Sequence, residues 1–122
     1  GKNLNEVFEN CVLALFECMA DLKTVKAKIK KEIKLENKEL DKLLYDFLEE
    51  IVFLKDTESL VFSKVNVNIK ENKIFKLNAI IYGDKINQEK QTLKDDVKAI
   101  TMHMFEIKKT GKGYKARVIV YI

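Results

Sequence analysis

Two segments of the chain repeat apolar residues with the period of an amphipathic helix. In residues 4–19 the apolar positions follow the i, i+3, i+4 rule without a gap, and Asn3 with Glu6 forms a capping pair. A second helical pattern opens at residues 37–38 and closes near residues 56–58. The chain is therefore predicted to form two helices, each with one broad apolar face.

Five further segments alternate apolar and polar residues, which is typical of strands that expose one face. They are residues 25–35, 61–71, 73–84, 97–108 and 114–122. Asn72 joins the second of these strands to the third, and a turn at residues 110–113 joins the fourth to the fifth. Two hairpins are therefore expected, because Asn and Gly tolerate the left-handed backbone of tight turns.

Residues 84–96 show neither period, so we expect a long loop there, and loops of this length in compact domains are often functional. The order of elements is helix, strand, helix and four strands. It favours an α+β fold, a two-layer sandwich with two helices packed on one face of a mainly antiparallel sheet. A length of 122 residues with 47% hydrophobic content fits one domain, residues 1–122, with one core.

The longest apolar runs are only a few residues, far below the roughly 20 that a bilayer requires, and no secretory signal is visible. We therefore expect a soluble, cytoplasmic protein. High Lys and Glu content without Pro or Trp is compatible with a heat-adapted source, although an A/T-rich genome gives the same bias.

The net charge is +4, and 22 of the 23 basic residues are Lys. Lysine offers point charges to phosphates but not the bidentate fork of Arg, so specific nucleic-acid readout is not expected. The predicted strand 25–35 carries four lysines, at positions 26, 28, 30 and 34, with no aromatic residue interleaved to stack on bases. This pattern favours a solvated face over a phosphate-binding stripe.

Few residues are candidates for catalysis. His103 is the only histidine and shares its predicted strand with apolar neighbours, which favours a structural role. Cys11 and Cys18 are seven residues apart in a helical pattern, which places them about 10 Å apart, beyond the roughly 7 Å limit for a disulfide. We expect buried free thiols. Neither a Gly-x-Ser-x-Gly elbow nor a Gly-rich phosphate loop is present, so an enzyme is not predicted.

Acidic residues cluster at the predicted ends of elements, at Asp21, Asp56, Asp84 and residues 95–96. Carboxylates at such positions can converge on a hard cation, but they are also routine helix caps and turn formers. For each of these acidic residues considered individually, the role of a cap or turn former is favoured over that of a metal ligand.

Five motifs carry a resemblance to a known family. They are the helix Leu-x-x-x-Phe-x-x-x-x-x-x-x-Phe-x-x-Met-x-Asp at residues 4–21, Asp56-Thr57-Glu58, Leu60-Val61-Phe62-Ser63-Lys64, Gly83-Asp84, and Val97-Lys98-Ala99-Ile100-Thr101-Met102-His103. In this order and spacing they resemble the archease family, and the resemblance covers essentially the whole chain.

The resemblance implies a non-catalytic partner of the RtcB-type RNA ligase of tRNA splicing, one that activates loading of that ligase with guanylate and its multiple turnover. RNA would then be contacted only indirectly. It also implies a divalent-metal site for calcium or a similar ion. In the family this site uses an Asp in an N-terminal His-Thr-Ala-Asp segment and an Asp-Ile pair at the extreme C-terminus.

This sequence departs from the family pattern at the metal site. The His-Thr-Ala-Asp segment is absent, which suggests a missing N-terminal strand, and Tyr121 stands where the second metal Asp is expected. A neutral phenol is a poor ligand for calcium compared with a carboxylate. Ile122 still offers a backbone oxygen or its terminal carboxylate. Gln91 falls where a His is common. We therefore expect weak metal binding or none.

Lys98 and Asp21 are the candidates for partner contact. For Lys98, a lysine snorkelling over the core and a cation held near the ligase are equally favoured. Two alternative functions stay open: a chaperone or modulator of RNA-modifying enzymes such as methyltransferases, and an RNA-binding module using the Lys-rich strand. Loss of a first strand would expose a sheet edge, so self-association is also expected.

Overall fold

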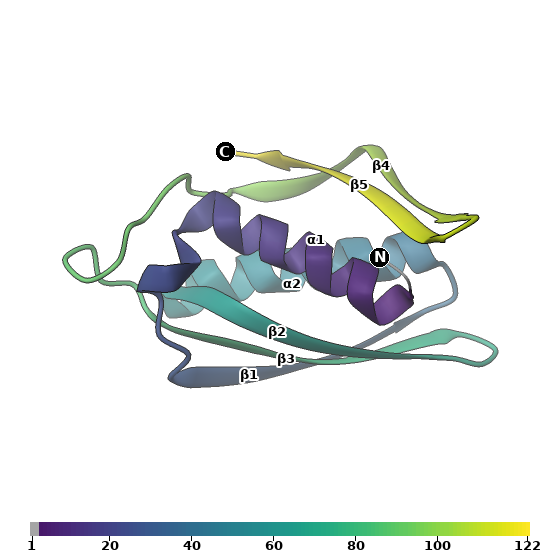
Figure 1. The fold of residues 1–122 in the computed structure, drawn as a ribbon, viewed down its shortest axis with the longest axis horizontal. Helices are drawn as coiled ribbons and strands as arrows, with labels where there is room; N and C mark the ends of the chain where they lie inside the picture. Colours follow the sequence, from purple (N-terminus) through teal and green to yellow (C-terminus); the bar gives the residue numbers. More distant parts are fainter. Residues whose placement is uncertain (1–2) are drawn as a thin grey trace.

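All of the predicted helices and strands are present in the computed structural model, which describes residues 3–122, with backbone alone at residues 102–104 and 121 (Figure 1). Two α-helices, one short 3-10 helix and five strands follow one another along the chain. They are α1 (Leu4–Met19), η1 (Leu22–Thr24), β1 (Ile29–Asn37), α2 (Leu40–Glu58), β2 (Leu60–Glu71), β3 (Phe75–Lys85), β4 (Ala99–Thr110) and β5 (Gly113–Tyr121).

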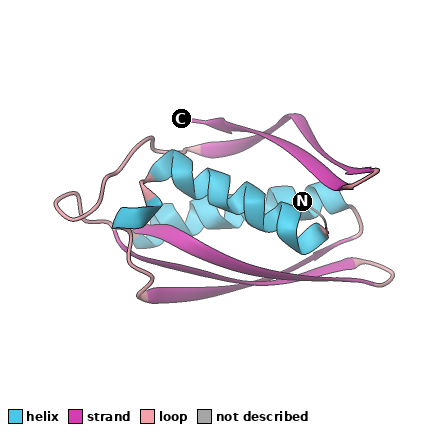
Figure 2. Ribbon diagram, in the orientation of Figure 1, coloured by secondary structure: helices cyan, strands magenta, loops and turns pink. Residues whose placement is uncertain are grey.

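The strands form two antiparallel sheets with both helices between them (Figure 2). β1, β3 and β2 make a three-stranded sheet in the order β1-β3-β2, and β4 pairs with β5 in a two-stranded sheet. The predicted α+β class with helices on one face of an antiparallel sheet is confirmed. The structure adds that the helices also cover a second sheet, because residues 86–98 carry the chain across to the other side of the helix layer (Figure 1).

The helix caps explain where each helix starts. The Asn3 side chain accepts a hydrogen bond from the backbone N–H of Glu6 at 2.9 Å, so the predicted cap of α1 is confirmed. α2 begins at Leu40, later than predicted, because β1 continues to Asn37 and pairs there with Phe75 of β3.

β1 begins at Ile29 rather than at residue 25, so the predicted start of this strand was wrong. Val25 is buried, but it packs with Ala20 and Val61 in a small cluster apart from the main core. The alternation from residue 25 therefore reflects two different buried sites. Lys31, which breaks the alternation, faces the helices and forms an ion pair with Glu58 at 2.6 Å.

One main hydrophobic core joins both sheets through the helices. Phe8 of α1 stacks on Phe47 of α2 with ring centroids 6.5 Å apart, and Phe16 contacts Phe62 of β2 at 5.5 Å. Burial of such large rings dominates the hydrophobic contribution to stability. Among the described residues no helix is long and apolar enough to cross a membrane.

Two features hold β2 against α1 and β3. Asn5 and Glu9 of α1 accept hydrogen bonds from the N–H groups of Ile69 and Val67, at 2.8 and 2.9 Å, which covers the outer edge of β2. At Gly83 of β3 the strands approach so closely that a Cβ atom would lie 2.0 Å from the carbonyl oxygen of Val61. Only glycine fits there.

Candidate functional site

The predicted site residues gather at one end of the molecule, around the long loop that precedes β4. Residues 92–95 of this loop run beside the end of α1, where Lys94 and Asp95 donate backbone hydrogen bonds to the carbonyls of Met19 and Cys18 at 2.8 and 3.0 Å. The carbonyl groups in the last turn of a helix have no hydrogen-bond donors within the helix, and the loop supplies these donors here. The loop is thus held against α1 by backbone bonds.

Lys55 holds the next part of the loop against α2. This residue is only 6% exposed, and its ammonium group donates to the Val97 carbonyl at 2.8 Å. It also forms ion pairs with Asp56 at 2.8 Å and with Asp96, which is in close contact. One buried cation therefore joins the end of α2 to the residues immediately before β4.

The charges at this contact reinforce one another. Burial opposes the charge on Lys55, but the Asp56 and Asp96 carboxylates outweigh it and raise the pKa of Lys55. The hydrogen bond from Lys55 lowers the pKa of Asp96, and the nearby charge of Lys98 lowers it further. Both groups therefore stay charged across the neutral range, which suits a fixed ion pair and not proton transfer.

Asp21 acts as a cap. Its side chain accepts a hydrogen bond from the backbone N–H of Lys23 at 3.2 Å, at the start of η1. Its backbone N–H donates a hydrogen bond to the carbonyl of Thr92 at 2.8 Å. The Thr24 hydroxyl donates to the Asp21 carbonyl and accepts a hydrogen bond from the backbone N–H of Thr92. The capping interpretation of Asp21 is confirmed, and the residue as a whole is half-buried beside the loop.

Gln91 organises the first half of the loop. It is 7% exposed, its amide nitrogen donates to the Lys85 carbonyl at 2.9 Å, and its oxygen accepts from the N–H of Asn87 at 2.8 Å. A buried amide with both ends bonded fixes the backbone around it. Gln91 therefore has a structural role at this position.

Lys98 lies at the exposed end of the two-stranded sheet. Ala99 pairs with Tyr121, so Lys98 is directly before that pair and Ile122 directly after it. Lys98 is exposed, and Ile122 is 65% exposed. The structure thus brings two of the predicted residues, Lys98 and Ile122, to the same end of the β4–β5 ladder, and Lys98 extends into solvent and does not lie over the core.

The described residues do not form a site suited to a hard cation. Among them no three His, Cys, Asp or Glu side chains converge. Asp56 of α2 and Asp96 of the loop share the Lys55 ammonium, and Lys98 adds a further positive charge beside Asp96. Calcium requires several oxygen ligands and is repelled by ammonium groups. The predictions for the side chains of Tyr121 and His103 fall outside the described part of the structure.

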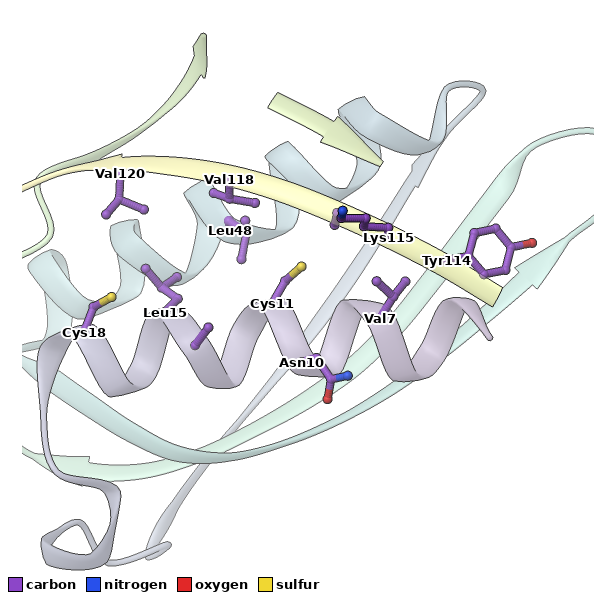
Figure 3. A pocket seen from close by; sticks show the side chains of 12 residues that line it. Val7, Asn10, Cys11, Leu15, Cys18, Leu48, Tyr114, Lys115, Val118 and Val120 are labelled. Atoms are coloured by element: carbon purple, nitrogen blue, oxygen red, sulfur yellow. The ribbon is translucent and has the colours of Figure 1, made fainter. Parts of the chain in front are cut away.

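A second feature is an apolar groove between α1 and β5 (Figure 3). Its volume is about 430 Å³, and Leu15 and Cys11 of α1 face Val118 and Val120 of β5 across it. In the described part of the chain, β5 pairs with β4 alone, so its other edge is open.

The two thiols border this groove (Figure 3). Both are free, as predicted, but Cys18 is exposed and Cys11 only half-buried, so the prediction of two buried thiols was wrong. The reason is that both residues lie on the side of α1 that faces the groove. Burial raises the pKa of Cys11, which disfavours the reactive thiolate.

Lys55 is the residue that the sequence analysis missed. A signal was present, because Lys55 follows Leu48 and Ile51 at the spacing of the apolar stripe of α2. A lysine on the buried face of a helix requires a partner, and the sequence offers the adjacent Asp56, whereas its second partner, Asp96, is 41 residues away.

Comparisons with known proteins agree with the resemblance seen in the motifs. The model of the archease protein family matches residues 1–122. The chain is 41% identical to the archease of Pyrococcus abyssi over 93% of its length and 80% of the relative's. It is 40% identical to that of Methanothermobacter thermautotrophicus over 98% and 86%.

A solved structure also matches the fold. The solution structure of Methanobacterium thermoautotrophicum protein 1598 superposes with a TM-score of 0.84 at 39% identity, and the match covers 98% of this chain and 85% of that one. The same arrangement of helices and strands is thus present in an experimentally determined structure.

Proposed function

Because this chain belongs to the archease protein family, we propose that it is a non-catalytic protein that activates an RtcB-type RNA ligase in tRNA splicing. The observation that carries the proposal is the family match over the full chain, together with the motifs around Lys98 and Asp21. Activation would consist of promoting the guanylation of the ligase and its repeated turnover.

The arrangement at the loop end supports an accessory role. Its two groups with shifted pKa values, Lys55 and Asp96, neutralise each other and are not poised to exchange protons near pH 7. Lys98, by contrast, is exposed and directly follows Val97, whose carbonyl accepts a hydrogen bond from Lys55. An exposed cation is suited to contact an acidic or nucleotide-bearing surface of a partner.

The test is a guanylation and ligation assay with the purified RtcB-type ligase of the same organism. Adding this chain should increase guanylated ligase and allow multiple turnovers, and Lys98→Ala should reduce the stimulation. Lys109→Ala is the matched control, because Lys109 is an exposed lysine near the opposite end of β4. Absence of stimulation, with a pull-down that recovers methyltransferases but no ligase, would favour the alternative of a modulator of RNA-modifying enzymes.

We also propose that this chain binds calcium weakly or not at all. Tyr121 replaces the expected carboxylate in sequence, and the ammonium groups of Lys55 and Lys98 flank the same end of the sheet. Isothermal titration calorimetry with calcium should give no saturable heat. A stoichiometric, tight isotherm would overturn this proposal without affecting that of ligase activation.

A further inference from the structure

The face of the three-stranded sheet that points away from the helices is covered by no other element in the part of the chain the structure describes (Figure 1). Alternate residues of β1, β3 and β2 point to this side, because their neighbours Ile33, Leu77 and Val67 fill the core. We call it the outer face. It is formed by Lys30, Glu32, Lys34, Glu36, Lys64, Asn66, Asn68, Lys70, Lys76, Asn78, Ile80 and Tyr82.

Positive charge exceeds negative charge on the outer face. Five of these residues are lysines and two are glutamates. Lys34 is 3.5 Å from Glu32, whereas no carboxylate lies within ion-pair distance of the other four lysines among the described residues. Lys70 is paired in register with Lys76, and Glu36 is in register with Lys76 on the other side, so one carboxylate lies beside this pair of lysines. The outer face therefore has a net positive charge.

An aromatic ring lies between two of these lysines. Tyr82 of β3 is in register with Lys30 of β1 on one side and with Lys64 of β2 on the other. Directly opposed residues have Cβ atoms about 5 Å apart, so Lys30, Tyr82 and Lys64 form one row of neighbouring residues across the sheet. Tyr82 is half-buried and Ile80, two residues earlier on the same face, is too. The sequence analysis found no aromatic among the lysines because the ring comes from a neighbouring strand.

The basic surface continues beyond the sheet into a cavity. Its volume is about 280 Å³, and lysines 26, 28, 85 and 90 line it together with Asp84. Lys28 continues β1 toward this cavity, because its N–H donates to the Gly83 carbonyl at 2.9 Å. At the other end of the sheet, a hollow is lined by three lysines and one glutamate, namely Lys34, Lys70, Lys76 and Glu36, so its charged lining is also predominantly basic.

We infer that the outer face binds single-stranded RNA directly, with lysines on the phosphates and Tyr82 stacked on a base. Lysines around a partly exposed aromatic ring are an arrangement suited to bind single strands. An anionic membrane or an acidic protein would be attracted by the lysines alone. A single-stranded RNA would in addition use the Tyr82 ring and the three asparagine amides, because its bases can stack and form hydrogen bonds. The choice of RNA over other polyanions rests on the proposed function in tRNA splicing. It differs from the expectation that RNA is contacted only indirectly.

The test is the salt dependence of binding, measured by fluorescence anisotropy with a labelled single-stranded RNA. If the five outer-face lysines each neutralise a phosphate, the slope of log K against log salt is about −3.5, so affinity falls about 100-fold between 50 and 200 mM salt. The triple variant Lys30→Gln, Lys64→Gln, Lys76→Gln should reduce this slope by about 2.

The matched control, Lys109→Gln with Lys112→Gln and Lys115→Gln, removes the same charge from exposed positions in the β4–β5 hairpin, which belongs to the other sheet. It should leave the slope unchanged. Circular dichroism of both triple variants establishes that each is folded. Equal losses in the two variants would overturn the inference, and so would absence of binding by the wild-type chain or binding to anionic phosphatidylserine vesicles in preference to RNA.

Tyr82 gives an independent readout. Tyr82→Ala should weaken binding about 5-fold or more at every salt concentration without changing the slope, because stacking involves no counterion release. Tyr82→Phe retains the ring and should bind as the wild type does. Identical affinities of the Ala and Phe variants would refute a stacking role. If RNA binding holds while the ligase assay shows no stimulation, the proposed function fails and the inference about the outer face stands.

Discussion

Replacing Lys55 by Met tests whether one buried ammonium group fastens the start of β4 to α2. Methionine is unbranched and apolar, so it fills the space of the lysine stem while the charge and its three contacts are lost. The change is confined to the interior end of the contact, because the side chain of Lys55 is only 7% exposed.

The expected loss follows from the exposure of the three partners. The side chains of Asp56 and Asp96 are 56% and 73% exposed, so both carboxylates regain water when the ammonium is removed. The carbonyl of the fully buried Val97 instead loses its donor, which costs about 1–3 kcal/mol. Loss of one partner from a fully buried ion pair would cost about 3–5 kcal/mol. We therefore expect a loss of about 1–3 kcal/mol and a fall in Tm of about 4–12 °C.

Urea unfolding at neutral pH, followed by circular dichroism, measures the free energy of unfolding of Lys55→Met. Lys42→Met is the control, because Lys42 is an exposed lysine of the same helix that pairs with Glu39. It should unfold as the wild type does. A Lys55→Met variant as stable as the wild type, or a control that loses as much, would refute the reasoning.

The same contact has a defined pH dependence. The pKa of Asp96 is lowered in the folded state, so its contribution is present above the ordinary Asp pKa of about 4 and is lost as pH falls through its folded value. The pKa of Lys55 is raised, so its contribution is present below the ordinary Lys pKa and is lost as pH rises through its folded value. The stability difference between wild type and Lys55→Met should therefore narrow in acid and in strong alkali.

Three further predictions concern the fold. Gly83→Ala should destabilise the protein by more than about 3 kcal/mol or prevent folding. The added Cβ would meet backbone atoms of Val61 and Phe62, which cannot move without breaking the β2–β3 pairing. The yield of soluble protein and thermal unfolding measure this effect. Asn3→Ala should cost about 1 kcal/mol by removing the cap of α1, whereas Asn3→Ser should cost less in the same urea titration. The open edge of β5 should promote self-association, so light scattering should show mass increasing with concentration, and a strictly monomeric profile would contradict it.

The elements were predictable because each carries a strong local signal. The apolar spacing of α1 and the cap at Asn3 are properties of adjacent residues, and the structure reproduces both. The division into two sheets was not predictable, since alternation specifies which face of a strand is buried but not which strand lies beside it. Ile33 and Phe105 both contact the core, yet they belong to different sheets.

The site was predicted less completely for the same reason. Lys98 and Ile122 were found from motifs, and the pairing of Ala99 with Tyr121 brings them to one end of the sheet. The contact of Lys55 with Asp96 spans 41 residues of sequence, and no local pattern specifies such a pair. The same holds for Tyr82, which meets Lys30 and Lys64 only through strand pairing.

The smaller sheet has only two strands, and a two-stranded hairpin is at best marginally stable in water. Its persistence therefore depends on α2, which contributes the Lys55 contact and the Glu49 carboxylate that accepts a hydrogen bond from the N–H of Ile100 at 3.1 Å. β4 and β5 should consequently open as one cooperative unit before the rest of the molecule unfolds, and their amides should exchange with solvent faster than those of the central strand β3. A partner that binds Lys98 would suppress the local opening of β4 and β5, and this single contact would therefore stabilise the protein.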